Sequence, residues 1–280
     1  MISLILITLN DQHNIKHCLN SLKKSKNYEL IIIDGNSNDQ TVKLSKQYTK
    51  KVFISSPGMH KQTLLGLTKA KYENVILLEA DHIYPKNFVQ TFYNEFKKSK
   101  KDIVQAKIDY ISKSNNFFKE GYKIFLKIHN LRNANKDKLI ATTCIAKKKI
   151  FHEIMKKLKN KKISGFGFDT SRAEIVKSMN LNVGLVDIFV NEIQEIDINK
   201  FIQRVKNYGN GDYEFFKKNS KDWKFLRKIK SIFHIFLRYF IIYPLKSFRH
   251  NPFVGIPYFL LIGILRYFFW FKNFFKSKGT

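Results

Sequence analysis

Short apolar runs, each closed by polar residues, constrain the fold of this chain more than any other feature. Three such runs occupy residues 2–9, 30–33 and 75–78, and a further short one covers 52–55. Apolar residues recur at helical spacing between the runs, as they do from Ile15 to Leu22. Strands that alternate with helices in this way predict an α/β fold, with a largely parallel sheet flanked by helices on both faces.

The residues that follow these runs are candidates for a ligand site. Asn10 closes the first run, Asp34 the second, and Glu79-Ala80-Asp81-His82 the run at 75–78. The carboxyl ends of such strands lie at the edge where open α/β sheets bind ligands. Glu79 and Asp81 supply the hard oxygen ligands that divalent cations prefer. An acidic turn without a ligand is the alternative, because short acidic motifs are common.

The opening strand and four segments after it, in order along the chain, resemble those of family 2 glycosyltransferases, which have the nucleotide-sugar-binding GT-A fold. The opening strand ends in Asn10, and residues 34–41 resemble the family's Asp-Gly-Gly-Ser-Thr-Asp-Gly-Thr loop. Residues 79–82, followed by Pro85, resemble the Asp-Ala-Asp-His segment of the cellulose and hyaluronan synthase branch. The resemblance covers roughly residues 1–215. It implies a mixed GT-A sheet flanked by helices.

The third segment, Gly-Phe-Gly-Phe-Asp at residues 165–169, resembles the stretch that places the catalytic base beside the acceptor. It implies that Asp169 is this base. A helical pattern follows, so Asp169 is also a candidate helix N-cap, and both roles are compatible. The fourth segment, residues 203–211, resembles the Gln-x-x-Arg-Trp and Arg-x-x-Tyr-Gly-x-Gly segments of the family. A basic amphipathic helix on the surface is its alternative interpretation.

The resemblance also implies a donor site and its chemistry. A divalent cation, Mn²⁺ or Mg²⁺, bound by Asp81 and Glu79 would stabilise the departing diphosphate. Asp169 would take the proton of the acceptor hydroxyl in a single, inverting displacement. His82 would contact a phosphate or the acceptor, or be structural. The implied donor-binding residues are Thr8, Asn10, Asp34, Lys61, Glu79, Asp81, His82, Gln203, Arg204 and Lys206.

Two departures from the family pattern keep alternatives open. Glu79 stands where the family has Asp, and Asn207 where it has Trp. A relative that binds sugar nucleotides without turnover is therefore one alternative. A basic nucleic-acid-binding protein is another, since the net charge is +29. No nucleic-acid motif accompanies that charge, so we expect a nucleotide-sugar donor and a lipid-linked or cell-envelope glycan acceptor, and no nucleic acid.

The C-terminal region differs in composition from the rest of the chain. Residues 217–280 contain fourteen Lys and Arg but one acid, Asp222, and eighteen of the 41 aromatic residues. Cations interleaved with aromatic rings suit an anionic membrane surface. We therefore predict a glycosyltransferase domain over residues 1–220 and a membrane-associating helical tail over 221–280.

Within this tail, residues 226–243 have the pattern of an amphipathic helix. Residues 253–271 are more uniformly apolar and would span about 28 Å as a helix. Arg266 would be costly inside a bilayer, which favours membrane association over a crossing. Two helices packed on a soluble domain are the alternative.

The chain begins with its first strand and shows no signal-peptide pattern, so we expect the catalytic domain at the cytoplasmic face of the inner or plasma membrane. Cys18 and Cys144 do not indicate a disulfide framework. Residues 109–139 look polar and irregular and are assigned to the acceptor side. A strand is expected over 139–146.

Overall fold

The computed structural model describes residues 1–111, 116–133, 139, 142–160, 168–193 and 196–276. It divides into two compact units. The sheet unit comprises Met1–Ile111 and Arg132–Gln194, and the helical unit comprises Ser112–Leu131 and Glu195–Thr280. Each unit is described by itself. The predicted boundary between residues 220 and 221 stays a prediction.

Within the described residues, the sheet unit contains one eight-stranded sheet in the order β3-β2-β1-β4-β7-β6-β8-β5. The first four neighbours, β3 to β4, are parallel, whereas β7 is antiparallel to both β4 and β6. The sheet is therefore mixed, as the GT-A resemblance implies. The strands are β1 Ile2–Thr8, β2 Tyr28–Asp34, β3 Val52–Ile54, β4 Asn74–Glu79, β5 His82–Ile83, β6 Ile103–Ile111, β7 Cys144–Lys147 and β8 Val183–Ile193.

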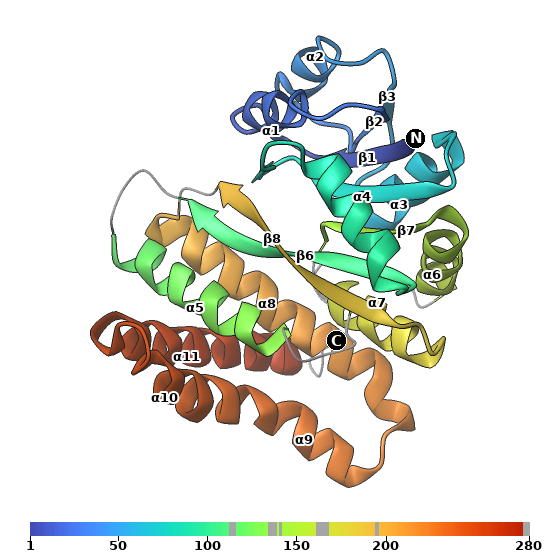
Figure 1. The fold of residues 1–280 in the computed structure, drawn as a ribbon. Helices are drawn as coiled ribbons and strands as arrows, with labels where there is room; N and C mark the ends of the chain where they lie inside the picture. Colours follow the sequence, from blue (N-terminus) through green and yellow to red (C-terminus); the bar gives the residue numbers. More distant parts are fainter. Residues whose placement is uncertain (112–115, 134–138, 140–141, 161–167, 194–195, 277–280) are drawn as a thin grey trace. The chain divides into compact units, whose positions relative to one another are not determined.

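Helices cover both faces of this sheet (Figure 1). Alternate residues of β1 point to opposite faces, so Leu4 and Leu6 pack with α1 and α4, while Ile5 packs with α3, α6 and α7. A Cβ on Gly66 of α3 would lie 2.4 Å from Ile5 Cγ2, so glycine allows α3 to approach the sheet closely. The helices are α1 Ile15–Leu22, α2 Thr41–Ser45, α3 Met59–Lys69, α4 Phe88–Ser99, α6 Lys148–Asn160 and α7 Phe168–Ser178.

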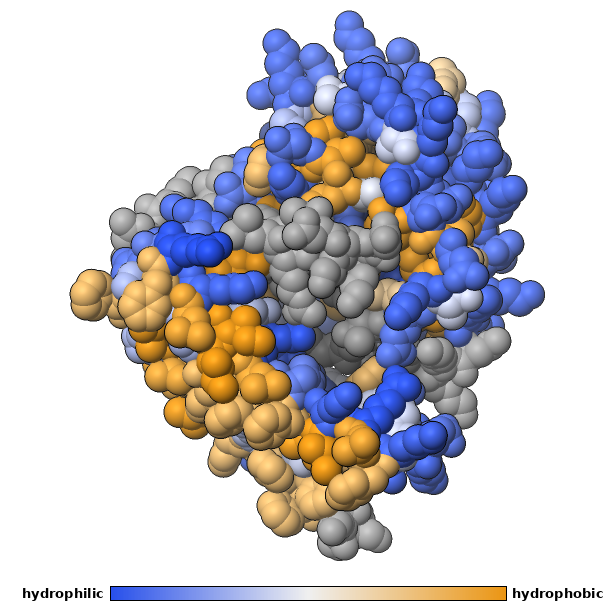
Figure 2. Space-filling view, turned by 60° about the horizontal axis from the view of Figure 1, so that its bottom comes forward, coloured by the Kyte–Doolittle hydropathy of each residue, from blue (hydrophilic) through white to orange (hydrophobic). Residues whose placement is uncertain are grey.

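The helical unit is built around α8, and its C-terminal part forms an antiparallel helical hairpin. Gly255 faces Ser247 and Gly263 faces Phe240, so the start of α11 lies beside α10 and its middle beside η2. Figure 2 is turned so that the bottom of Figure 1, where α9, α10 and α11 are drawn, faces the reader. Apolar side chains gather over the lower part of this view. The elements are most of α5 Phe117–Asn133, then α8 Ile198–Asn219, η1 Ser220–Asp222, α9 Phe225–Phe236, the π-helical segment η2 Leu237–Ile242, α10 Tyr243–Ser247 and α11 Pro252–Lys276.

Helix α5 contradicts one expectation from the sequence, namely that residues 109–139 are irregular. The expectation is wrong because the apolar side chains of this segment fall on one side of a helix, as Phe118 and Tyr122 do. Phe118 packs on Phe201 of α8, with ring centroids 4.8 Å apart. The strand expected over 139–146 is observed as β7, which begins at Cys144.

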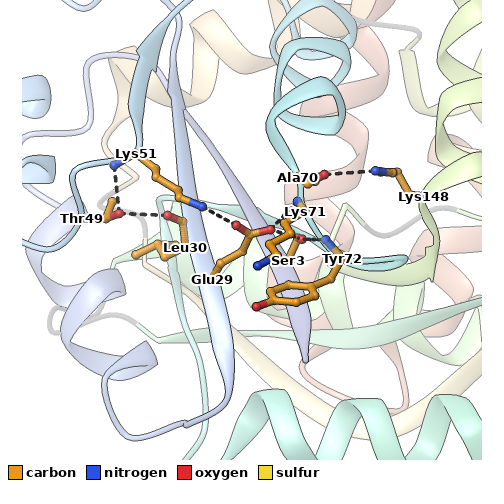
Figure 3. A network of polar contacts seen from close by, with 9 residues as sticks. All are labelled: Ser3, Glu29, Leu30, Thr49, Lys51, Ala70, Lys71, Tyr72 and Lys148. Atoms are coloured by element: carbon orange, nitrogen blue, oxygen red, sulfur yellow. Dashed lines mark hydrogen bonds and ion pairs between the residues drawn. The ribbon is translucent and has the colours of Figure 1, made fainter.

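The amino ends of the strands, at one edge of the sheet, are tied together by a polar network (Figure 3). Glu29 of β2 accepts hydrogen bonds from Lys51 Nζ at 2.6 Å, from the Lys71 backbone N–H at 2.6 Å and from the Ser3 hydroxyl. The Ser3 hydroxyl in turn accepts from the Tyr72 backbone N–H at 3.0 Å. These contacts link β1, β2 and the segments preceding β3 and β4.

Candidate active site

The opposite edge, at the carboxyl ends of β1 and β2, carries two interlocked loops. The Asn10 backbone N–H donates to Ser37 Oγ at 2.8 Å, and the Asn38 backbone N–H donates to Asn10 Oδ1 at 2.9 Å. Asn10 and Asn36 both adopt positive φ angles, 55° and 69°, which asparagine tolerates better than most residues. Asn10 therefore holds the second loop through its backbone and its side chain.

Thr8 and Asp34 end β1 and β2 beneath these loops. The Asp34 side chain is fully buried, and its two oxygens accept from the Ser37 backbone N–H and hydroxyl at 2.7 and 2.6 Å. The Thr8 hydroxyl donates to Asp11 Oδ2 at 2.8 Å. Gln62 of α3 donates to the carbonyls of Thr8 and Ile33, at 2.9 and 3.0 Å. These contacts give the edge a defined shape. The donor-binding roles of Thr8, Asn10 and Asp34 stay predictions.

An acidic cluster lies at the end of the neighbouring strand, β4. Glu79, Asp81 and His82 each offer one ligand atom, and these atoms lie within 4.8 Å of one another. The cluster forms because β4 ends at Glu79, a two-residue turn carries Asp81, and β5 begins at His82. The Ile193 backbone N–H donates to the Asp81 carbonyl at 2.7 Å, which fixes this turn against β8.

The cluster is held from the side of β7 as well. His82 is 1% exposed; its Nε2 lies 3.9 Å from Glu79 Oε2 and its Nδ1 lies 3.4 Å from Thr143 Oγ1. The Thr142 hydroxyl donates to Glu79 Oε2. The two carboxylates and the imidazole are a donor set that fits a hard divalent cation such as Mg²⁺ or Mn²⁺.

Asp11 is a neighbour of this cluster that the sequence analysis missed. Burial raises the pKa of Asp11, the Leu9 backbone N–H and the Thr8 hydroxyl lower it, and the negative charges of Asp81 and Asp39 raise it further. Asp11 follows Asn10 directly, so its position after a buried strand was the available signal. Three carboxylates thus concentrate negative charge where two strands end.

Arg172 of α7 and Glu79 line the same small cavity, together with Met59, Thr63 and Thr142. Arg172 is buried, and it lies one helical turn after Asp169. Asp169 is the second residue of α7; its side chain, and the predicted Gly-Phe-Gly stretch before Phe168, lie outside the described residues.

The other predicted donor-binding residues lie on two helices, α3 and α8. Lys61 is exposed in the first turn of α3. Gln203, Arg204 and Lys206 lie on α8 of the helical unit, so this segment is helical, in agreement with its alternative interpretation as a basic amphipathic helix. The Arg204 guanidinium lies 4.2 Å from the centre of the Tyr122 ring. How these residues approach the acidic cluster stays a prediction.

Residues 3–158, more than half of the chain, match Glycosyl transferase family 2. The chain belongs to this family. A curated relative, poly(ribitol-phosphate) beta-N-acetylglucosaminyltransferase TarP of Staphylococcus aureus (strain N315), is 31% identical over 117 residues. That match covers 38% of this chain, and the chain spans about a third of the relative, 36% of its length.

Solved structures of two proteins support the fold. S. aureus TarS 1–349 in complex with UDP-GlcNAc has a TM-score of 0.52 and 15% identity, covering 93% of this chain and 79% of TarS 1–349. Glucosyl-3-phosphoglycerate synthase from Mycobacterium tuberculosis, in complex with Mg²⁺ and UDP, has a TM-score of 0.54 and 13% identity, covering 78% and 79%. The predicted family and GT-A fold are thereby confirmed. The assignment to the synthase branch stays a prediction.

Proposed function

We propose that this family 2 member is a metal-dependent, inverting glycosyltransferase that moves a sugar from a nucleotide-sugar donor to a lipid-linked or cell-envelope glycan at a membrane. The observation that carries the proposal is the cluster of Glu79, Asp81 and His82 at the carboxyl edge of a GT-A sheet. Ligands bind at this edge in open α/β folds. The UDP complexes of the two structural neighbours are consistent with a nucleotide-sugar donor.

Asp81 and Glu79 would hold Mn²⁺ or Mg²⁺ through their carboxylate oxygens. When bound, such an ion stabilises the negative charge that develops on a departing diphosphate. The loops built by Asn10 and Asp34 would receive the nucleoside, and Lys61 would approach its phosphates. Gln203, Arg204 and Lys206 would add polar and cationic contacts to the diphosphate, with Lys206 acting as a point charge.

Asp169 would remove the proton from the acceptor hydroxyl as that oxygen attacks the anomeric carbon. Support comes from Arg172, which follows on the same helix and lines a cavity with Glu79. Attack from the face opposite the departing diphosphate inverts the anomeric configuration. In the acceptor's absence, water is the competing nucleophile.

The comparisons and α11 support the proposed acceptor and the proposed location. TarP is named for transfer to a poly(ribitol-phosphate), which favours a cell-envelope polymer or its lipid-linked precursor as acceptor. Among the described residues, α11 is the one helix long and apolar enough to cross a membrane, with a mean hydropathy of 1.7. We place the active site at the cytoplasmic face, where nucleotide sugars are made.

The test is a donor screen with the full-length protein in detergent, in the presence of Mg²⁺ or Mn²⁺. Membrane lipid extract and poly(ribitol phosphate) serve as separate acceptors, and released nucleoside diphosphate and incorporated sugar are both measured. We expect one donor to support transfer that EDTA abolishes. Asp169→Asn should retain donor binding but lose transfer. Donor binding without turnover in any acceptor arm would identify a non-catalytic relative, and no binding of any donor would overturn the proposal.

A further inference from the structure

One side of the segment α9-η2-α10 is an unbroken, exposed apolar stripe. Its members recur every three or four residues, as Leu226, Ile229, Phe233, Leu237, Ile241, Leu245 and Phe248. The opposite side is buried within the helical unit and carries Ile235, Tyr239, Tyr243 and Ser247. The segment therefore has one face in the protein and one apolar face outside it.

The π-helical segment η2 explains why the stripe stays on one side. Four residues of an α-helix turn by about 400°, so the stripe would drift by about 40° at each of its four-residue steps from Ile229 to Leu245. The wider π turn over Leu237–Ile242 takes up an extra residue and offsets this drift. The two faces of the segment thus stay aligned from Phe225 to Phe248.

Helix α11 carries a second exposed apolar stripe. Its members are Phe253, Ile264, Phe268, Phe271 and Phe275, and Phe253 is 91% exposed. The apolar side chains in the lower part of Figure 2 gather where α9, α10 and α11 come forward. Soluble monomers rarely expose so many large apolar side chains together, so the stripes indicate a binding surface.

The charge around the stripes selects the partner. Residues 217–280 contain fourteen Lys and Arg against one acid, Asp222. The exposed cations include Lys224, Arg227, Lys230, Lys246, Arg249 and Lys272. A second copy of this chain would bring the same positive charge against itself. An anionic lipid surface instead offers acyl chains to the stripes and phosphate groups to the cations.

Helix α11 is tied to a polar partner, which argues against a crossing. Arg266 is 9% exposed, and its guanidinium pairs with Asp212 of α8 and donates to the Tyr239 hydroxyl at 2.8 Å. Helix α8 also carries the exposed charges of Lys206, Glu214 and Lys217. If α11 spanned a bilayer while packed on α8, these charges would enter or face the hydrocarbon, which is strongly unfavourable.

We propose that the helical unit docks on anionic bilayers through the stripes of α9-η2-α10 and α11, with these helices lying in the interface and not crossing it. This inference rests on the proposed function only in placing the acceptor at a membrane, and it adds how the protein binds that membrane. The buried Arg266–Asp212 pair lets a long apolar helix remain part of a peripheral protein.

Vesicle flotation tests the docking. The full-length protein is mixed with vesicles of phosphatidylcholine alone or of phosphatidylcholine and phosphatidylglycerol. We expect the wild type to bind the anionic vesicles and salt to weaken this binding. The triple variant Phe233→Ser/Leu245→Ser/Phe253→Ser should bind them about tenfold more weakly, or weaker still. Phe189→Ser, which removes an exposed apolar side chain from β8 of the sheet unit, is the matched control and should bind like the wild type.

Equal binding by the wild type and the triple variant would overturn the proposal, as would no binding by either. Sedimentation without lipid distinguishes membrane docking from self-association. If the wild type were a dimer and the triple variant a monomer, the stripes would be an interface between protein chains. Circular dichroism verifies that each variant is folded. Exposed positions were chosen so that the substitutions remove no core contact.

The in-plane orientation has its own test. Cysteines introduced as Asn251→Cys and Lys276→Cys flank α11, and the native Cys18 and Cys144 are buried. On sealed vesicles, a membrane-impermeant maleimide should label both positions at similar rates. Protection of one end would show a crossing and overturn the proposal. Donor binding measured without lipid distinguishes these failures from failure of the proposed transferase, because none of the proposed donor-binding residues belongs to the stripes.

Discussion

The two edges of the sheet place carboxylates in opposite surroundings. At the amino edge, Glu29 accepts from Lys51, Ser3 and Lys71. Burial alone would raise the pKa of Glu29, but these hydrogen bonds and the Lys51 charge lower it. At the carboxyl edge, burial raises the pKa of Asp11, and the charge of Asp81 raises it further.

The difference separates a carboxylate that stabilises the fold from carboxylates that we propose bind a cation. Donors around Glu29 stabilise its charge, so this carboxylate contributes to holding β1 and β2 in register. Burial and the negative charges of Asp81 and Asp39 raise the pKa of Asp11 and so disfavour its ionisation in the protein alone. A bound cation would relieve that repulsion. Functional sites commonly concentrate such unfavourable charge.

The largest effect is expected for Asp81→Asn. Loss of a metal-binding carboxylate should reduce kcat on the order of 10³-fold, about 4 kcal/mol in the activation barrier. The melting temperature should stay the same or rise, since one repelling charge is removed. Sugar-transfer assays and calorimetry measure the two effects. Unchanged transfer would remove Asp81 from the proposed site.

Glu29→Gln should show the reverse, with transfer unchanged and the free energy of unfolding lowered by about 2 kcal/mol. The physical reason is the loss of charge-assisted hydrogen bonds from Lys51 and Lys71. Urea denaturation measures the change. Glu95→Gln is the control. Within the described part of the chain, Glu95 forms one ion pair, with exposed Lys98 at 3.3 Å, so its replacement should alter stability little. Equal stability of the two variants would contradict this role of Glu29.

Asp11→Asn should reduce transfer less than Asp81→Asn does. We expect transfer to fall about tenfold, through a weaker local field for the cation, without loss of stability. The amide oxygen can still accept from Thr8, as Asp11 Oδ2 does at 2.8 Å. A Mg²⁺ titration of activity should show the shift as a higher half-saturating concentration. A marked loss of stability instead would make Asp11 a structural residue like Glu29.

The smallest effect is the pH dependence of the amino edge. Because the folded-state pKa of Glu29 lies below its ordinary value of 4.5, its stabilisation is present above that pH and is lost as pH falls through the lower folded value. The stability difference between wild type and Glu29→Gln should therefore be full at neutral pH and shrink in acid. Urea curves across this range measure it. If the stability difference between the two proteins persisted at the lowest pH, it would come from packing and not from the charge of Glu29.

The fold and the acidic cluster were largely predictable because their signals are local. The apolar runs that became β1, β2 and β4 are continuous in sequence, and the residues after them lie at one edge by topology alone. Glu79, Asp81 and His82 come from four consecutive positions, so their proximity needed no knowledge of the tertiary structure.

Contacts between distant segments were not predictable in this way. Helix α5 was missed because its aromatic residues are interleaved with polar ones and find partners such as Phe201 far along the chain. The sequence analysis considered the cost of Arg266 in a bilayer but did not foresee its partner Asp212, which lies 54 residues earlier in the chain. The role of Asp11 required knowing that the ends of β1 and β4 are neighbours.

The Arg266–Asp212 pair also bears on how the chain can be shortened for biochemistry. Cutting after residue 220, where composition changes, would strip α11 from α8. Asp212 would lose Arg266, and Phe201 and Tyr213 would lose the rings of Tyr258 and Trp270 that pack on them. Such a fragment should aggregate even though its sheet is intact. Replacing the outward phenylalanines by serine while retaining all 280 residues is the sounder route to a detergent-free preparation.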